Sequence, residues 1–196
     1  MYPYNFKMGQ TIQTNVPGVV CDRWDGAHFQ VAAANASAGS AVGIHAAIAL
    51  TASLQTIITG FTQPSVPRNI TIKGNAAGIA GNVVVTGTNY ADDVITETIA
   101  LNAATEVLGN KAFNTVTSVA LPVQTNAGTD TVSIGFGEKL GLPYLLTHNK
   151  IIAAYRNNII EGTAATVTLS ANLIESNTID LSSALNGTVV DVYLMV

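Results

Sequence analysis

Apolar and polar residues alternate with a period of two along most of the chain after residue 46. In residues 69–73 two isoleucines flank a threonine, and in residues 131–136 valine, isoleucine and phenylalanine alternate with small or polar residues. Such alternation puts successive side chains on opposite faces of a β-strand. The pattern predicts strands over residues 48–51, 56–59, 69–73, 82–88, 94–101, 112–121, 130–136, 140–146, 151–156, 165–171, 178–181 and 188–196.

Turn-forming sequences separate these segments at intervals of roughly ten residues, which is typical of antiparallel sheets. They are KGNAAG, TGTNYADD, LGNK, NAGTD, NNIIEGT and LNGT. A helix over residues 32–54 is a weak alternative because glycines interrupt it, and residues 182–185 could form a single helical turn. The expected fold is therefore all-β, an antiparallel β-sandwich or barrel-like domain.

Residues 1–40 differ in composition from the rest of the chain. They contain the one tryptophan, Trp24, with prolines at Pro3 and Pro17 and a stretch rich in Ala, Ser and Gly. We therefore expect an extended N-terminal arm and connector over residues 1–40 and a β-sandwich domain over residues 41–196. An arm of this kind either reaches a neighbouring subunit or folds back on its own domain.

Charged residues make up 10% of the chain and hydrophobic residues 48%, whereas charged residues are about 25% of a typical soluble domain. This sparse charge suggests a protein that is covered by neighbouring molecules. The net charge is −4 and the basic residues are scattered, so no nucleic-acid partner is expected. The apolar stretch 31–54 is interrupted by polar residues, so we expect no membrane span. Residues 1–13 lack the apolar segment of a signal peptide, so we do not expect secretion by the signal-peptide route.

The segment 73–82, KGNAAGIAGN, is similar in glycine content to a phosphate-binding loop. Such loops lead from a strand into a helix whose amides face the phosphate, but NVVVTGT follows here and is a poor helix start. A hairpin connection is the better interpretation. GFGEKLG, residues 135–141, misses the dinucleotide-binding spacing by one residue and runs into Leu142 and Pro143, so we expect a bulged turn in which Glu138 and Lys139 form an exposed pair.

No residue pattern names a catalytic, cofactor or metal site. His28, His45 and His148 are far apart in sequence, and the single cysteine, Cys21, lacks the surroundings of a nucleophile. Asp92 and Asp93, together with Asn89, could supply oxygen ligands to calcium, but adjacent acids at a turn are more often solvated. We therefore predict a protein that is not an enzyme and has no cofactor.

Several segments resemble virion structural proteins of tailed bacteriophages. The most specific are the strand start VPRN, the turn KLGLPY and the terminal strand NGTVVDVYLMV, and the similarity spans about residues 66–196 with a weaker part at 46–63. The resemblance implies a non-enzymatic capsid decoration (cement) protein, a homo-oligomer with a trimer favoured, bound to the major capsid protein or other virion proteins. It fixes no binding or catalytic residue.

Two alternatives remain open from the sequence. The same fold could serve as a tail, connector or head-fibre component, which differs from a decoration protein in copy number per virion. It could also bind host-surface carbohydrate, because sugars stack on exposed aromatic rings. Aromatic residues are 6% of the chain, and Tyr90, Tyr144 and Tyr155 are the candidates for such a surface.

Overall fold

The computed structural model describes residues 11–13, 17, 20–22, 25–124, 126 and 128–196. The described chain is all-β, with antiparallel sheets that pack as a sandwich and two short 3₁₀ helices, η1 (Ala33–Asn35) and η2 (Ile174–Ser176). The predicted fold class is therefore confirmed. No helix among these residues has the length and apolar character needed to cross a membrane.

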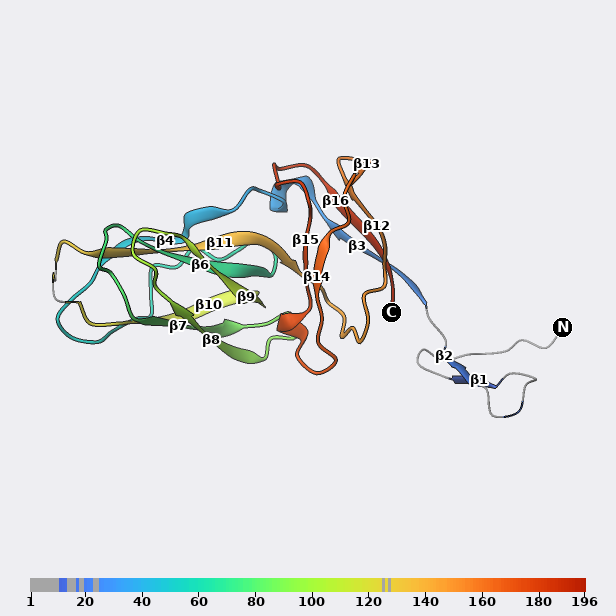
Figure 1. Ribbon diagram of the computed structural model, residues 1–196, viewed down its shortest axis with the longest axis horizontal. Coiled ribbons are helices and arrows are strands. Elements are labelled where there is room, and N and C mark those ends of the chain that lie inside the picture. Colours follow the sequence, from blue (N-terminus) through green and yellow to red (C-terminus); the bar gives the residue numbers. More distant parts are fainter. Residues whose placement is uncertain (1–10, 14–16, 18–19, 23–24, 125, 127) are drawn as a thin grey trace.

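The sandwich consists of a six-stranded sheet and a four-stranded sheet that face each other (Figure 1). The larger sheet has the order β14-β15-β11-β6-β9, with β4 also paired to β11, and the smaller has the order β5-β10-β7-β8. Their bounds are β4 Ser40–Ala49, β5 Gln55–Ile57, β6 Arg68–Gly74, β7 Asn82–Thr88, β8 Val94–Ala100, β9 Val107–Phe113, β10 Thr115–Leu121, β11 Thr131–Gly141, β14 Thr166–Thr168 and β15 Thr178–Asp180.

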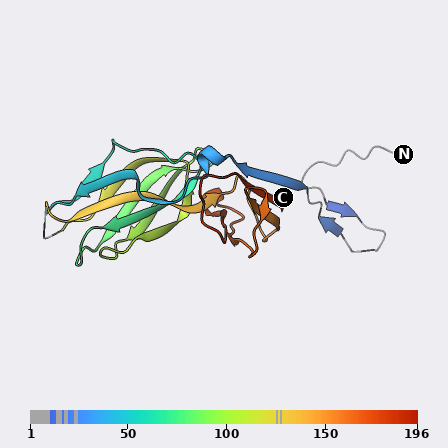
Figure 2. The ribbon, with the colours of Figure 1, turned by 90° about the horizontal axis from the view of Figure 1, so that it is seen from above.

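A further four-stranded sheet, here called the C-terminal sheet, lies at one end of the sandwich (Figures 1 and 2). Its order is β13-β12-β16-β3, with bounds β3 Gly26–Val31, β12 Ile151–Arg156, β13 Ile159–Ile160 and β16 Val190–Met195. A separate two-stranded sheet is formed by β1 (Thr11–Gln13) and β2 (Val20–Asp22), which pair only with each other.

Two hydrophobic cores fill these layers, and β11 contributes to both. Val132 and Ile134 of β11 belong to the core of the sandwich, while Leu140 belongs to the core beneath the C-terminal sheet. Between them the pairing of β11 with β6 shifts register from Phe136 to Leu140. This bulge lets one strand of 11 residues change direction and serve two cores.

The buried Arg68 lies at this change of direction. Its side chain is 1% exposed, its guanidinium carbon lies 5.1 Å from the centre of the Phe136 ring, and its Nη2 donates to the carbonyl of Asn35 over 3.1 Å. Burial lowers the pKa of Arg68, and the nearby Glu138 carboxylate opposes that effect. The VPRN segment is therefore a junction between the two cores as well as a strand start.

Most predicted strands are present, but several local predictions are wrong. The weak helix alternative over residues 32–54 is not observed, and η1 and β4 lie there instead. Ile44 and Ile48 of β4 are both buried, since residues four apart share a face of a strand as well as of a helix. Residues 182–183 form a bend and residues 184–185 have no regular structure, so there is no helical turn. LGNK lies inside β9, and the strand predicted over 140–146 ends at Gly141.

The glycine-rich segment 73–82 does not form a hairpin. It leads from β6 in one sheet to β7 in the other and therefore crosses between the layers of the sandwich. Gly78 and Gly81 have positive φ of 93° and 108°, a backbone conformation that residues with a side chain rarely adopt. A Cβ at Gly81 would also lie 2.7 Å from Cβ of Pro122, so backbone geometry accounts for these glycines.

The predicted N-terminal arm lies partly outside the described residues. Within its described part, β3 is a strand of the C-terminal sheet and pairs with β16 over six residues without a register shift. Residues 26–31 are therefore part of the folded body, although no strand was predicted there.

Candidate interaction surface

The outer face of the C-terminal sheet carries a row of rings that crosses three strands. His28 of β3 stacks on Tyr193 of β16 with ring centres 4.7 Å apart and planes within 8°, and Tyr155 of β12 meets Tyr193 edge-on at 5.8 Å. The strand register explains this row, because His28 is paired with Tyr193 and side chains of paired residues lie side by side on one face. We call these three rings, with Gln30 and Asp191, the ring face.

Asp191 anchors the polar side of the ring face. One oxygen, Oδ1, accepts from Nε2 of Gln30 at 2.7 Å and is 2.8 Å from Nε2 of His28. The Asp191 side chain is 10% exposed, whereas that of His28 is 43% exposed. The acid therefore holds two side chains of β3 in fixed positions against β16, and the rings above it are pre-organised.

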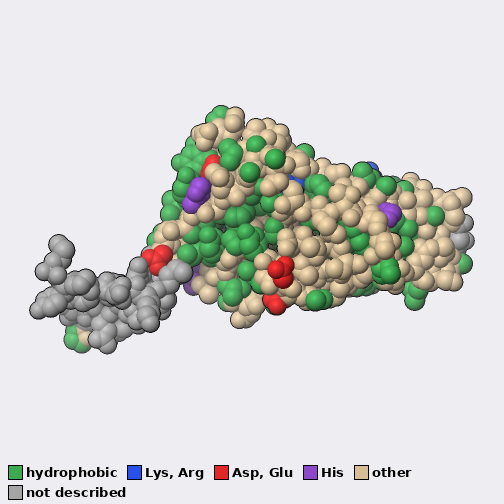
Figure 3. Space-filling view, turned by 180° about the vertical axis from the view of Figure 1, so that it is seen from behind, with side chains coloured by type: hydrophobic (Ala, Val, Ile, Leu, Met, Phe, Trp, Pro, Cys, Tyr) green, Lys and Arg blue, Asp and Glu red, His purple; other side chains and the backbone are tan. Residues whose placement is uncertain are grey.

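Exposed aliphatic residues flank the ring face. Ile160 of β13, opposite Tyr155 in the register, is 58% exposed, Ile152 of β12 is 66% exposed, and Tyr193 itself is 43% exposed. Figure 3 shows hydrophobic side chains gathered at the end of the molecule that carries the C-terminal sheet, with few charged side chains on the same view. Large exposed apolar side chains with little charge are a feature of surfaces that bind other macromolecules.

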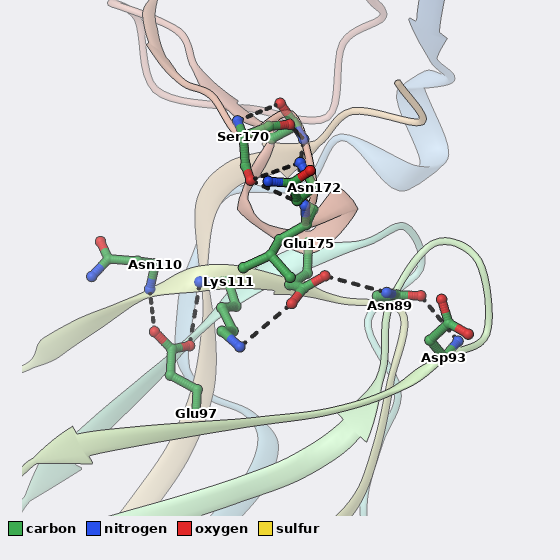
Figure 4. A network of polar contacts seen from close by, with 10 residues as sticks. Asn89, Asp93, Glu97, Asn110, Lys111, Ser170, Asn172 and Glu175 are labelled. Atoms are coloured by element: carbon green, nitrogen blue, oxygen red, sulfur yellow. Dashed lines mark hydrogen bonds and ion pairs between the residues drawn. The ribbon is translucent and has the colours of Figure 1, made fainter. Parts of the chain in front are cut away.

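A polar network joins the sandwich to the segment beneath the C-terminal sheet (Figure 4). The Glu175 carboxylate of η2 is buried and lies 3.4 Å from Nζ of Lys111 on β9, and it accepts from Nδ2 of Asn89 at 3.3 Å. Glu97 of β8 accepts the backbone N–H groups of Asn110 and Lys111. These bonds connect η2 with β9, the β7–β8 turn and, through Lys111, β8.

Buried Asn177 fixes the neighbouring loops in the same way. Its amide donates to the carbonyls of Ser170 and Leu173, and its oxygen accepts the N–H groups of Ser170 and Leu146. All four hydrogen-bonding positions of this side chain are therefore used. The segments around residues 146 and 170–173 are consequently tied to one point.

The turn that was a candidate calcium site is built differently from a metal site. Oδ1 of Asn89 accepts the N–H groups of Ala91 and Asp93, and Asp92 has a positive φ of 63°. The amide oxygen thus shapes the β7–β8 turn. Within the described part of the chain, no group of three or more His, Cys, Asp and Glu side chains is placed to hold a metal ion.

Glu138 and Lys139 are not the exposed turn pair that the sequence suggested. They lie inside β11, where Glu138 accepts the N–H groups of Gly39 and Leu185, and Lys139 donates its backbone N–H to Asn69 and its Nζ to Asn110. They line a cleft of about 360 Å³ that also contains Glu106 and Asp180. Burial raises the pKa of Asp180, with Lys139 opposing and Glu138 adding to the rise.

The three histidines lie in separate places, as their sequence spacing suggested. His28 belongs to the ring face, Nδ1 of His45 is 2.7 Å from the carbonyl of Ala46, and Nδ1 of His148 is 2.9 Å from the hydroxyl of Thr147. Cys21 lies in β2.

Of the three candidate tyrosines, only Tyr155 belongs to the ring face. Tyr144 packs against the second core and Tyr90 is in the β7–β8 turn. Among the described residues, Tyr90, Tyr144 and Tyr155 make no ring contact with one another. Sequence reasoning missed Asp191 and Tyr193, although the alternation in the terminal strand, VDVYLM, puts both on one face.

Comparisons with known proteins add little to this picture. No family model and no curated protein matches the chain. Among solved structures, the chain is similar to one in the crystal structure of the infectious bursal disease virus VP2 subviral particle, with 12% sequence identity and a TM-score of 0.23. The similarity covers 99% of this chain and 48% of that chain, so this chain spans about half the other's length. A TM-score this low carries no argument about fold or function, and the resemblance to phage virion proteins stays a prediction.

Proposed function

We propose that this protein is a non-enzymatic structural component of a tailed-phage virion, and specifically a capsid decoration (cement) protein. It would bind the lattice of the major capsid protein and stabilise the head. The observation that carries the proposal is the ring face, a fixed, sparsely charged surface flanked by exposed Ile152 and Ile160. A small rigid module with such a surface stabilises a shell because a modest interface is repeated over many copies.

Physical arguments support a lattice-binding role for this surface. Apolar and aromatic side chains dominate the fully buried centre of protein interfaces, where charged residues are depleted. Tyrosines whose rings are already held in place lose little conformational freedom on binding. Asp191 supplies that order here, because it fixes His28 and Gln30 before any partner arrives.

The test is binding of the purified protein to expanded, DNA-filled heads that lack it, followed by the temperature at which the heads rupture. We expect the protein to bind and to raise that temperature. The double variant Ile160→Ser/Tyr193→Ser should bind at least about tenfold more weakly, since hot-spot truncations usually cost more than 1 kcal/mol each. Leu54→Ser is the matched control, because Leu54 is 79% exposed and lies outside the C-terminal sheet.

Two results would overturn the proposal: equal binding to unrelated particles, or absence of the protein from purified virions. Copy number separates decoration from the tail, connector or head-fibre alternative, since hundreds of copies per virion indicate the lattice and about a dozen or fewer indicate a vertex or tail position.

The carbohydrate alternative is less favoured by the ring geometry. His28 covers one face of the Tyr193 ring, and sugar platforms need an open ring face. A glycan array on which the protein gives no signal would remove that alternative.

A further inference from the structure

The outer edge of β3 carries backbone groups that have no strand partner in the described part of the chain. Asp25 and Val196 exchange both backbone hydrogen bonds, over 3.0 and 2.9 Å. Hydrogen-bonded and non-hydrogen-bonded pairs alternate along an antiparallel ladder, so residues 27, 29 and 31 bond to β16 as well. The N–H and C=O groups of Gly26, His28 and Gln30 therefore point away from the sheet, and within the described part of the chain nothing pairs with them.

Several other described edges are covered, shorter or less regular than that of β3. The edge of β9 is covered by Glu97 of β8, whose carboxylate accepts the N–H groups of Asn110 and Lys111. In β4, the pairing with β11 shifts register twice and the carbonyl of Ile44 is used by the N–H of Thr62. The edge strands β5, β13 and β14 have three, two and three residues.

Strand β3 has none of the features that normally prevent edge pairing. It contains no proline, no lysine and no bulge over its six residues, GAHFQV. A regular, uncharged edge of this length is a template for another strand. Its outward residues, Gly26, His28 and Gln30, are all exposed.

We propose that β3 of one molecule pairs antiparallel with β3 of a second copy of this chain, across a two-fold axis at His28. In this register His28 faces His28 of the second copy, and Gly26 faces Gln30. The three outward residues of each copy then form three hydrogen-bonded pairs, so every unpaired group on both edges gains a partner. The spacing of the open groups is symmetric about His28, which is what a self-complementary two-fold contact requires.

The ring face supports this pairing. Side chains of directly opposed residues lie on the same face of a sheet, so the two His28 rings would stand next to each other. The row Tyr155, Tyr193, His28 would continue into the second copy as a single row of six rings across one continuous sheet. This contact closes with two copies and is distinct from the trimer that the resemblance favours. The proposed pairing also does not depend on where in a virion the protein lies.

The first test is the mass of the full chain in solution by sedimentation equilibrium, from low micromolar to millimolar concentration. We expect a reversible shift from 20.3 kDa to twice that mass. Gly26→Pro removes an outward N–H from each copy and leaves the bonds to β16 intact, so it should weaken dimerisation about 30-fold, as expected for two lost hydrogen bonds. Gly26→Ala is the matched control, since a Cβ there meets nothing within 4 Å and the N–H is retained, and it should dimerise normally.

The second test fixes the register by disulfide formation in a Cys21→Ser background. His28→Cys should form a cross-linked dimer, because opposed Cα atoms in such a pair are about 5.5 Å apart. Gln30→Cys should not, because in this register the two copies of residue 30 are offset by four residues along the strand, about 13 Å. Far-ultraviolet circular dichroism checks that both variants fold.

The proposal is overturned by a chain that stays monomeric at millimolar concentration, by a trimer, or by Gly26→Pro dimerising as well as Gly26→Ala. Cross-linking through Gln30→Cys and not His28→Cys would likewise exclude this register. None of these results bears on whether the protein decorates heads, so the two proposals fail separately.

Discussion

Lys111→Met should destabilise the protein because it leaves the Glu175 carboxylate buried without its cation. The Glu175 side chain is 5% exposed and lies 3.4 Å from Nζ of Lys111, whose side chain is 30% exposed. Removing one partner of a fully buried ion pair costs about 3–5 kcal/mol. Because water reaches Lys111, we expect a loss of about 2–3 kcal/mol in the free energy of unfolding.

A double-mutant cycle separates this effect from a simple loss of packing. Glu175→Gln removes the charge and can still accept the hydrogen bond from Asn89, so it should cost about 1 kcal/mol alone. Added to Lys111→Met, it should recover about 1–2 kcal/mol, since the uncompensated buried charge is gone. Urea unfolding followed by circular dichroism measures all four proteins, and the slope against urea concentration reports whether the two cores still unfold together.

The reasoning is refuted if the two substitutions are additive within about 0.5 kcal/mol, the usual scatter for residues that do not interact. Lys111 would then contribute through its aliphatic stem, and the contact with Glu175 would carry no coupling energy. A Lys111→Arg control retains the charge and should stay close to the parent protein.

Three further substitutions test other parts of the structure. Gly81→Ala should lower the free energy of unfolding by about 1–3 kcal/mol, more than Gly78→Ala. Both glycines have positive φ, but only at Gly81 would the added Cβ meet Pro122. Thermal unfolding of the two variants makes the comparison. Asp180→Asn should stabilise the protein at neutral pH. Burial raises the folded-state pKa of Asp180, so the protonated acid stabilises the fold, and this stabilisation is lost as pH rises from the ordinary Asp pKa through the raised one. A pH series of unfolding should show that decline for the parent protein and not for the variant. Arg68→Met should change the free energy of unfolding by less than about 1 kcal/mol, since a buried charge is exchanged for apolar volume. Arg68→Ala should cost about 3 kcal/mol, because it leaves a cavity. Equal losses of the two variants in urea unfolding would contradict this reasoning.

The strands could be predicted from the sequence wherever the alternation is regular. Strands β7 and β8 pair without a register shift, and their predicted and observed bounds nearly coincide. Two of the errors fall where bulges occur: β4 shifts register twice against β11, and β11 shifts between Phe136 and Leu140. A bulge breaks the period of two, so a pattern that depends on this period misreads these segments.

The ring face could not be assembled from the sequence because its members come from opposite ends of the chain. His28 and Asp191 are separated by 163 positions, and only the pairing of β3 with β16 brings them together. No strand was expected at residues 26–31, because the tryptophan, the prolines and the stretch rich in Ala, Ser and Gly within residues 1–40 suggested an arm. Sequence could place Asp191 and Tyr193 on one face, but not the strand that lies beside them.

The difference between protected and open edges links the fold to assembly. In the sandwich, Glu97 occupies the space where a side chain at Gly109 would lie, since a Cβ there would be 2.6 Å from Oε2 of Glu97. Glycine at this position therefore allows a carboxylate to cover the edge of β9, which keeps that edge from pairing with other strands. In the C-terminal sheet, by contrast, Asp191 lies on the outer face and holds His28 and Gln30, and the outward backbone groups of β3 have no strand partner in the described part of the chain. A regular edge that has no strand partner in the described part of the chain favours pairing with another strand. Its position beside the pre-organised ring face therefore fits the proposed association of two copies.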